Sequence, residues 1–219
     1  MDWQQADQVT KDDSFVRLFA VWQRLQGSPA ADPASDSFER IELDIIKGDT
    51  RTREFLRKFP NGRIPAVELD DGRRLFESNA IMWHFAETSP LVPKDPFERA
   101  RALQWMFFEQ YSHEPYIAVA RFLAMYPDHR DERRAGLPRI INGGYDALGV
   151  MESHLGGGGE GDHAREFFVE GRYSIADIAL YAYTHVAHEG GFDLANYPAI
   201  RDWLARVKSQ PRHIPITRG

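Results

Sequence analysis

Two segments in the first half of the chain carry groups that could bind a small ligand with a peptide main chain. In the first, Pro65 follows Ile64, and a cis bond between them would turn the amide and carbonyl of Ile64 outward. In the second, Glu77 and Ser78 open an expected helix, whose free amides and dipole favour a carboxylate. The Glu77 side chain can also accept a hydrogen bond from an ammonium group. The two segments together could therefore recognise an amino-acid-like end and the main chain beside it.

Each segment also has a simpler explanation on its own. An Xaa–Pro pair before a strand is commonly just a strand start, and Glu–Ser at a helix start is commonly just a cap. For each segment taken alone, the structural interpretation and the ligand-binding interpretation both remain open. Ligand recognition is favoured by their order and spacing, and by the helical half of the chain that follows them.

The elements that position these groups are predicted from local patterns. Helical spacing of apolar residues predicts a helix over residues 14–26, and alternation of Ile41, Leu43 and Ile45 with acidic residues predicts a strand. A short helix is expected over residues 50–58. The runs 65–69 and 73–76 flank Asp70–Asp71–Gly72, which is typical of a β-hairpin. Ser78 then caps a helix through about Glu87.

The second half of the chain is predicted to be all helical. The segment 89–96 has three prolines and no helical periodicity, so it is expected to be a linker. Expected helices follow at about 97–126, 130–155, 174–189 and 198–209. The first has an aromatic face and a kink at Pro115. Ser174 and Asp177 form a capping-box pattern, which we interpret as structural.

Composition limits the classes of function. The 219 residues include no cysteine, which excludes disulfides, a catalytic thiol and thiolate metal ligands. A net charge of −6 argues against broad nucleic-acid binding, and no apolar run is long enough to span a membrane. We therefore expect a cytoplasmic protein with no nucleic-acid or membrane partner. His185, His188 and Glu189 have spacing that could hold a metal, but without further ligands we assign no metal.

The segment NGRIPAVELDDGRRLFESNAIMWHFAE, residues 61–87, resembles the glutathione-binding half of the cytosolic glutathione transferase family. The family pattern there is Gly-Lys/Arg-Ile/Val-Pro, a hairpin, and Glu-Ser at a helix start. LQWMFFEQYSHEPYIAVARF and YSIADIALYAYTHVAHEGGF are similar to the helical half of bacterial members. The resemblance implies an α/β plus all-α architecture. A thioredoxin-like domain of order βαβαββα over residues 1–88 would be joined by the linker 89–96 to an all-helical domain over 97–219.

The resemblance also implies an activity and its residues. Glutathione would be the co-substrate, and its thiolate would attack a small hydrophobic electrophile. Glutathione would bind Ile64, Pro65, Glu77 and Ser78 of the two segments, and its glycine carboxylate would meet Arg63 or Lys47. Tyr111 and His113 stand where the family lines its hydrophobic substrate pocket. Family members form homodimers, to which Phe76 could contribute here.

The residue that activates the thiol is expected near the N-terminus. Residues 3–9 are mostly polar for a buried first strand, and no tyrosine precedes Tyr111, so Thr10 or Ser14 would supply the hydroxyl. Asp12 and Asp13 fall at the same helix start and would repel a thiolate. The alternative is a glutathione-transferase-fold protein that binds without catalysis because this loop is degenerate.

Overall fold

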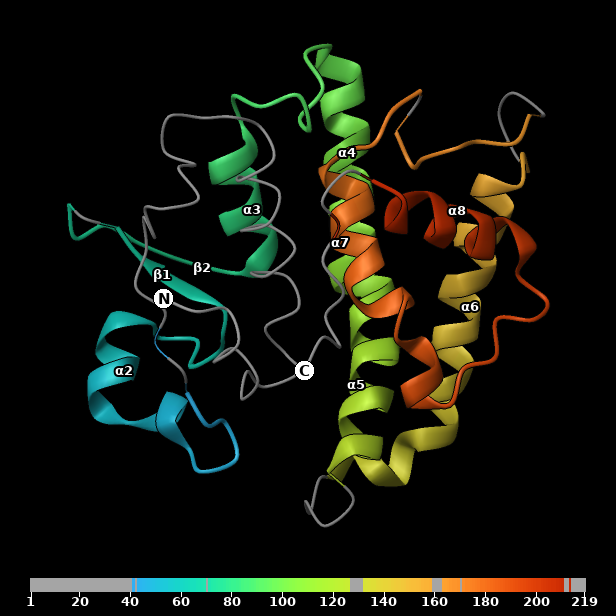
Figure 1. Cartoon of the computed structure of the whole chain (residues 1–219). Coiled ribbons are helices and arrows are strands. Elements are labelled where there is room, and N and C mark those ends of the chain that lie inside the picture. The colour runs from blue at the N-terminus through green and yellow to red at the C-terminus, as the bar shows by residue number, and fades with distance from the viewer. Residues whose placement is uncertain are drawn as a thin grey trace. The chain divides into compact units, whose positions relative to one another are not determined.

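The computed structural model describes residues 41, 43–69, 71–126, 132–158, 163–169, 171–210 and 213, and Figure 1 shows the chain as a ribbon. The chain divides into two compact units, one made of Met1–Ser89 together with Pro211–Gly219 and the other running from Pro90 to Gln210. The helix expected over residues 14–26 and the first strand lie outside the described residues. Each unit is described by itself.

The described part of the first unit is a β-hairpin with helices before and after it (Figure 1). The elements are η3 (Asp49–Arg51), α2 (Arg53–Lys58), β1 (Ala66–Glu68), β2 (Arg74–Phe76) and α3 (Ser78–Ala86). Helix α2 begins because the Thr52 hydroxyl accepts from the Phe55 amide at 3.2 Å. The helices expected at 50–58 and from Ser78 are therefore confirmed.

The hairpin has the strands and turn that the sequence predicts. Its strands are antiparallel, and Ala66 pairs with Phe76 at the end away from the turn. The turn is closed by hydrogen bonds of 2.8 Å from the Leu69 amide to Arg73 O and from the Gly72 amide to Leu69 O. Gly72 has a φ of 80°, a left-handed value that glycine adopts without steric cost.

The prediction of a strand over residues 41–45 is wrong for the described residues of that range. Residues 43 and 44 carry no strand, and residues 45–48 form a turn. The Asp44 carboxylate builds this turn by accepting from the amides of Ile46 at 2.9 Å and Lys47 at 3.0 Å. The hydrogen bond from the Lys47 amide lowers the pKa of Asp44. A local side-chain acceptor therefore outweighs the alternating apolar pattern.

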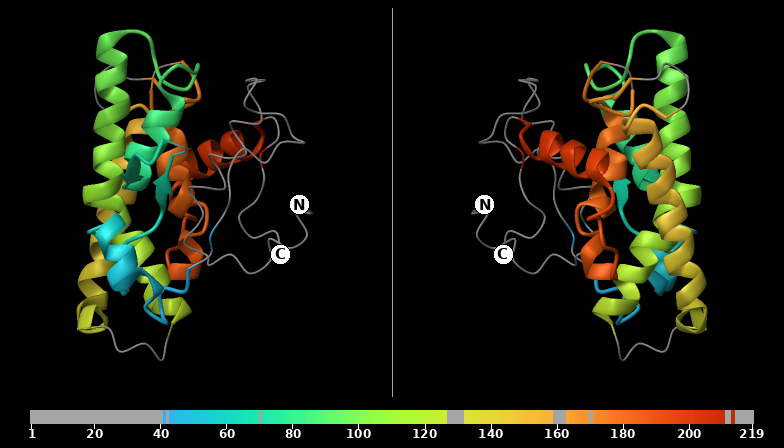
Figure 2. Two further views of the ribbon diagram at one scale, coloured as in Figure 1. Left: turned by 90° about the vertical axis from the view of Figure 1, so that its left-hand side faces the viewer. Right: turned by 90° about the vertical axis from the view of Figure 1, so that its right-hand side faces the viewer.

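The second unit is helical, as expected. Its elements are α4 (Pro96–Phe108), η4 (Glu109–His113), α5 (Glu114–Met125), η5 (Glu132–Gly136), α6 (Leu137–Leu155), α7 (Ile175–Thr184), η6 (Ala187–Gly190) and α8 (Pro198–Lys208). Helix α7 packs against α4, α6 lies along α5, and α8 packs against α6 (Figures 1 and 2). None of the helices described here is both long and apolar enough to cross a membrane.

The long helix expected over residues 97–126 is interrupted by one π-helical turn. The turn η4 joins α4 to α5, and the Glu114 amide donates to Glu109 O, five residues earlier. Pro115 lies in the first turn of α5, where its missing amide is tolerated. The irregularity expected from Pro115 is present, and it takes the form of a π turn with Glu109 and His113 buried.

The core of the second unit surrounds α7 and the buried carboxylate of Asp177. Every residue of α7 except Tyr183 is buried. Asp177 Oδ1 accepts from the Phe168 amide at 3.1 Å and from Trp203 Nε1 at 3.0 Å. Asp177 Oδ2 accepts from the amide and hydroxyl of Ser174, both at 2.9 Å. The capping box is confirmed, and the same carboxylate also ties α8 and the segment before α7 to the helix start.

Replacing Asp177 with Ala should destabilise the protein by about 3 kcal/mol, because four buried donors lose their acceptor. Burial raises the pKa of Asp177 to about 6, and the four hydrogen bonds oppose that shift. Urea denaturation at pH 7.5 measures the effect, with Asp202→Ala on the exposed face of α8 as control. A loss below about 1 kcal/mol, similar to the control, would show that this network does not hold the core together.

Candidate functional site

The two segments singled out in the sequence meet at the open end of the hairpin. Because Ala66 pairs with Phe76, Ile64 and Ser78 each lie two residues beyond the last strand pair on neighbouring strands. The Ile64–Pro65 peptide bond is cis. The structure therefore brings together Ile64, Pro65, Glu77 and Ser78, which the sequence assigns to one site.

Backbone groups at this end of the hairpin are available to a ligand. Within the described residues, neither the amide nor the carbonyl of Ile64 has a hydrogen-bond partner. The amide and hydroxyl of Ser78 also lack partners there, and no side chain caps α3. Buried main-chain groups are normally paired, and groups at a rim without protein partners are paired by water or by a ligand. The site thus offers a donor and an acceptor from Ile64 and donors at a helix N-terminus.

Glu77 stands between strand and helix in an unusual backbone conformation. Its φ of 69° lies in the left-handed region, and it is the one residue other than glycine with such a φ in the part of the chain that the structure describes. The Glu77 carbonyl accepts the first helical bond of α3, from the Ile81 amide at 3.0 Å. Its exposed carboxylate accepts from Asn61 Nδ2 at 2.7 Å through Oε1. Asn61 is a site residue that sequence reasoning missed.

The loop before the cis bond is shaped by Gly62. Its φ is 63°, and a Cβ there would lie 2.5 Å from Arg51 Nη1 and 2.9 Å from Leu56 Cδ2. The Gly62 amide donates to Phe59 O at 3.0 Å, which closes a tight turn after α2. The backbone angle therefore favours glycine, and a Cβ would also displace the ends of the Arg51 and Leu56 side chains. This turn carries Asn61 toward Glu77.

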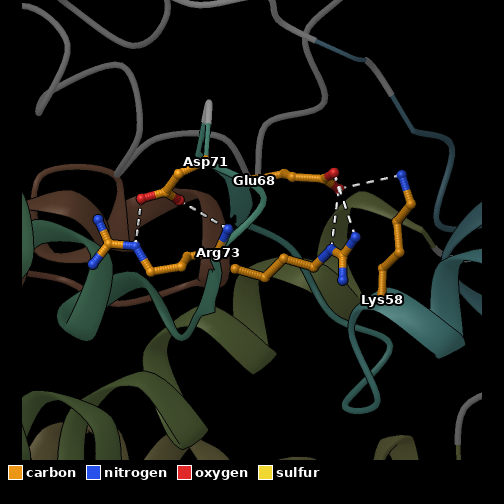
Figure 3. A network of polar contacts seen from close by, with 5 residues as sticks. Lys58, Glu68, Asp71 and Arg73 are labelled. Atoms are coloured by element: carbon orange, nitrogen blue, oxygen red, sulfur yellow. Dashed lines mark hydrogen bonds and ion pairs between the residues drawn. The ribbon is translucent and has the colours of Figure 1, made fainter.

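A surface ion network joins α2 to the hairpin (Figure 3). Glu68 Oε2 lies 3.2 Å from Lys58 Nζ and 3.1 Å from Arg74 Nε, and these contacts lower the pKa of Glu68. Asp71 pairs with Arg73 at the hairpin turn. Exposed ion pairs of this kind contribute little to stability individually. The pair between Lys58 and Glu68 nevertheless connects α2 to β1, on either side of the segment 59–65 that contains Asn61 and the cis bond.

The two cations assigned to a carboxylate differ in their surroundings. Arg63 is exposed, and it has no hydrogen bond or ion pair within the described residues. Lys47 is paired with Asp44, with Nζ 3.0 Å from Oδ2, and this contact raises the pKa of Lys47. Arg63 is therefore the cation that is available without breaking an existing pair.

Tyr111 and His113 lie in different environments, although both belong to η4. The Tyr111 side chain is exposed, whereas His113 is fully buried. Thr184 Oγ1 donates to Leu180 O at 2.6 Å, so it accepts from His113 Nε2 at 2.8 Å. Burial lowers the pKa of His113 to about 3, so the ring is neutral at physiological pH. Tyr111 can meet a ligand directly, and His113 shapes the turn that presents it.

The second unit also has an open groove between α4 and α6. Its volume is about 570 Å³, and its walls include Gln104, Trp105, Val150 and His154. Neither Tyr111 nor His113 lines it. The groove is therefore distinct from the pocket to which the sequence assigns those two residues.

Other candidate residues are not brought into the site by the described structure. Thr10 and Ser14 lie outside the described residues, so their assignment stays a prediction. His185 Nδ1 donates to Tyr181 O at 2.7 Å, and its ring stacks on Tyr181. Among the residues that the structure covers, no group of three or more His, Asp or Glu side chains could hold a metal ion.

Comparison with known families matches both halves of the chain. Residues 31–87 match the family described as "Glutathione S-transferase, N-terminal domain", and residues 134–206 match "Glutathione S-transferase, C-terminal domain". The crystal structure of a glutathione S-transferase from Pseudomonas fluorescens is similar, with 47% identity and a TM-score of 0.80. The similarity covers 94% of each chain.

Two curated relatives show the range of functions on this fold. The disulfide-bond oxidoreductase YfcG of Escherichia coli is 30% identical over 189 residues, which is 80% of each protein. Elongation factor 1-gamma of Rattus norvegicus is 31% identical over 172 residues, which is 74% of this chain and 36% of that longer protein. Similarity of this kind identifies the fold and the family, but it does not select one reaction.

The buried His113 makes stability depend on pH. Because its pKa is about 3 in the folded protein and near 6.5 when unfolded, only the unfolded chain binds a proton in between. The free energy of unfolding should therefore fall as the pH falls from 6.5 toward 3, with His113 contributing about 1.4 kcal/mol per pH unit. The substitution His113→Gln should remove that contribution. The control His84→Gln should not, because the His84 side chain on α3 is exposed. Denaturant titrations from pH 7.5 to 4.5 measure it, and equal slopes in wild type and His113→Gln would contradict the account.

Proposed function

Since the chain belongs to the glutathione S-transferase family, we propose that it binds glutathione in its first unit and transfers the glutathione thiolate to a hydrophobic electrophile. Glutathione is a co-substrate in this reaction, and no metal takes part. The proposal rests on the open end of the hairpin, where Ile64, Glu77 and Ser78 offer complementary groups within one short region.

The groups at this site match the groups of glutathione one by one. The α-carboxylate of the γ-glutamyl residue fits the amide and hydroxyl of Ser78 at the start of α3. The α-ammonium fits the Glu77 carboxylate, and the cysteine main chain fits the amide and carbonyl of Ile64, which have no partner among the described residues. The glycine carboxylate fits Arg63, which has no competing partner within the described structure. Lys47 is the second candidate, and it would first have to leave Asp44.

Activation of the thiol is assigned to the N-terminal loop. A thiol with a pKa near 8.5 must be lowered by roughly two units, about 2.7 kcal/mol, to be mostly ionised at neutral pH. A hydroxyl from Thr10, or less directly from Ser14, contributes about 1.5–3 kcal/mol when it donates to a charged sulfur. The chain has no cysteine, so the reacting sulfur comes from glutathione.

The electrophile would be held by the helical half of the chain. Tyr111 presents a large exposed ring on the π turn, and aromatic rings of this kind bind apolar ligands with a polar end. His113 supports that turn from the core through Thr184. The substrate pocket proposed for these two residues is therefore formed by Tyr111 at its surface, with His113 behind it.

A second function, binding without catalysis, is favoured by one observation. Residues 3–9 are mostly polar where an apolar first strand is expected, and Asp12 and Asp13 lie at the helix start between Thr10 and Ser14. Elongation factor 1-gamma shares this fold region as one part of a longer protein. In this alternative the chain binds glutathione or a partner but does not activate the sulfur.

We further propose a cytoplasmic homodimer, to which the exposed Phe76 at the end of β2 contributes.

Glu77→Ala should weaken glutathione binding by about 1.5–3 kcal/mol, because the ammonium loses a charged partner. Isothermal titration calorimetry measures the affinity directly. Glu54→Ala is the control, since Glu54 is an exposed glutamate on α2 outside the site. Absence of binding to the wild-type protein at millimolar glutathione would overturn the proposed function.

The substitution Thr10→Ala distinguishes the catalytic function from the alternative of binding without catalysis. For the enzyme, the variant should keep its affinity for glutathione and lose about 10- to 100-fold in turnover of a generic aryl halide at neutral pH. The matched control is Thr52→Ala, which removes a hydroxyl that caps α2 away from the sulfur. Glutathione binding by wild type without any turnover above the uncatalysed rate would select the alternative function.

A further inference from the structure

We propose that Asn61 is a positioning residue for ligand recognition: its side-chain amide fixes the Glu77 carboxylate so that the second carboxylate oxygen is kept for an α-ammonium group. This inference rests on the proposed function, because it concerns how Glu77 recognises glutathione. It assigns a role to a residue that is not expected to touch glutathione itself.

The contact is short and leaves half of the carboxylate free. Asn61 Nδ2 donates to Glu77 Oε1 at 2.7 Å. Within the described residues, no other group pairs with the Glu77 carboxylate. Oε2 is therefore the oxygen that can accept from a ligand. A free glutamate side chain populates many rotamers in water, and a single anchored oxygen removes most of that freedom before the ligand arrives.

The chemistry of an amide suits this task. Asn61 is neutral, so it orients the Glu77 carboxylate without cancelling its charge. A lysine or arginine at the same place would pair with the carboxylate and compete with the ligand's ammonium. A hydrogen bond from a neutral donor therefore keeps both the geometry and the negative charge of the recognition group.

Asn61 is itself held by the loop around it. Arg51 Nη1 donates to Asn61 O at 3.5 Å, and the Phe59–Gly62 turn is closed by a 3.0 Å backbone bond. Gly62 has no side chain, and Arg51 occupies the space where a Cβ would lie. A turn alone would not need the Asn61 side chain to reach a residue 16 positions later in the sequence. The loop thus presents a side chain as well as reversing the chain direction.

The test compares two ligands on matched variants. The ligands are glutathione and its des-amino analogue, glutaryl-cysteinyl-glycine, which lacks the α-ammonium group. The variants are Asn61→Ala, Glu77→Ala, the double variant, and Asn142→Ala as a control on the exposed face of α6. Calorimetry gives each dissociation constant, and the side-chain amide resonance of Asn61 reports its hydrogen bond without any ligand.

A positioning role predicts a specific pattern. Asn61→Ala should raise the dissociation constant for glutathione about 5- to 10-fold and change that for the des-amino analogue less than 2-fold. In the Glu77→Ala background, the same substitution should have no further effect on glutathione binding. Asn142→Ala should affect neither ligand. The Asn61 amide resonance should shift in Glu77→Ala.

The contrary outcomes are separable. Equal losses for both ligands in Asn61→Ala would mean that Asn61 only maintains the loop, which overturns the positioning role and leaves the proposed function intact. Additive losses in the double variant would overturn it as well. If wild type binds neither ligand, the proposed function fails and the inference fails with it.

Discussion

The site depends on the backbone of Glu77, which is held in a conformation that side-chain-bearing residues rarely adopt. A φ of 69° costs about 1–3 kcal/mol for a residue that is not glycine. The cost is offset because Glu77 is fixed on both sides, by the strand that ends at Phe76 and by the helical bond from Ile81. Glu77 therefore turns the chain from β2 into α3, and it directly precedes Ser78, the first residue of that helix. Ile64, Pro65 and Ser78, which belong to the proposed glutathione site, lie at the same end of the hairpin as this turn.

The two units are stabilised by different kinds of polar interaction. In the described part of the first unit, ion pairs such as Lys58–Glu68 lie at the surface and contribute little individually. In the second unit, Asp177 is buried and accepts from four donors on three separate segments. Loss of a buried acceptor is expensive, whereas loss of an exposed pair is screened by water. The helical unit is thus stabilised by one buried carboxylate, whereas the hairpin has main-chain groups at Ile64 and Ser78 that have no partner in the part of the chain that the structure describes.

Much of the described fold could be predicted because its signals are local. The hairpin follows from Asp70–Asp71–Gly72 between two apolar runs, and the start of α7 follows from the capping pattern at Ser174 and Asp177. The strand expected over residues 41–45 was wrong because the Asp44 side chain takes the local amides, which an alternating pattern does not reveal. The irregularity expected at Pro115 is present as a π-helical turn with Glu109 and His113 buried, a form that the sequence pattern does not reveal.

The candidate site was predictable only in part. Ile64, Pro65, Glu77 and Ser78 could be grouped because they flank one hairpin, and hairpin pairing brings its ends together. Asn61 could not be found, since an asparagine before a glycine is typical of a turn and its contact with Glu77 is tertiary. The burial of His113 could not be predicted from the sequence either, because the spacing of aromatic residues along a helix does not show which of them is buried.

The most direct test of the account is a two-dimensional ¹H–¹⁵N spectrum of the assigned protein during titration with glutathione. The account predicts that the amide resonances of Ile64, Glu77 and Ser78 shift together along one saturating curve, because all three residues would contact the ligand. Resonances of α8 should stay unchanged. Saturable shifts confined to other residues, with these three amides unmoved at millimolar glutathione, would contradict the claim that the open end of the hairpin is the glutathione site.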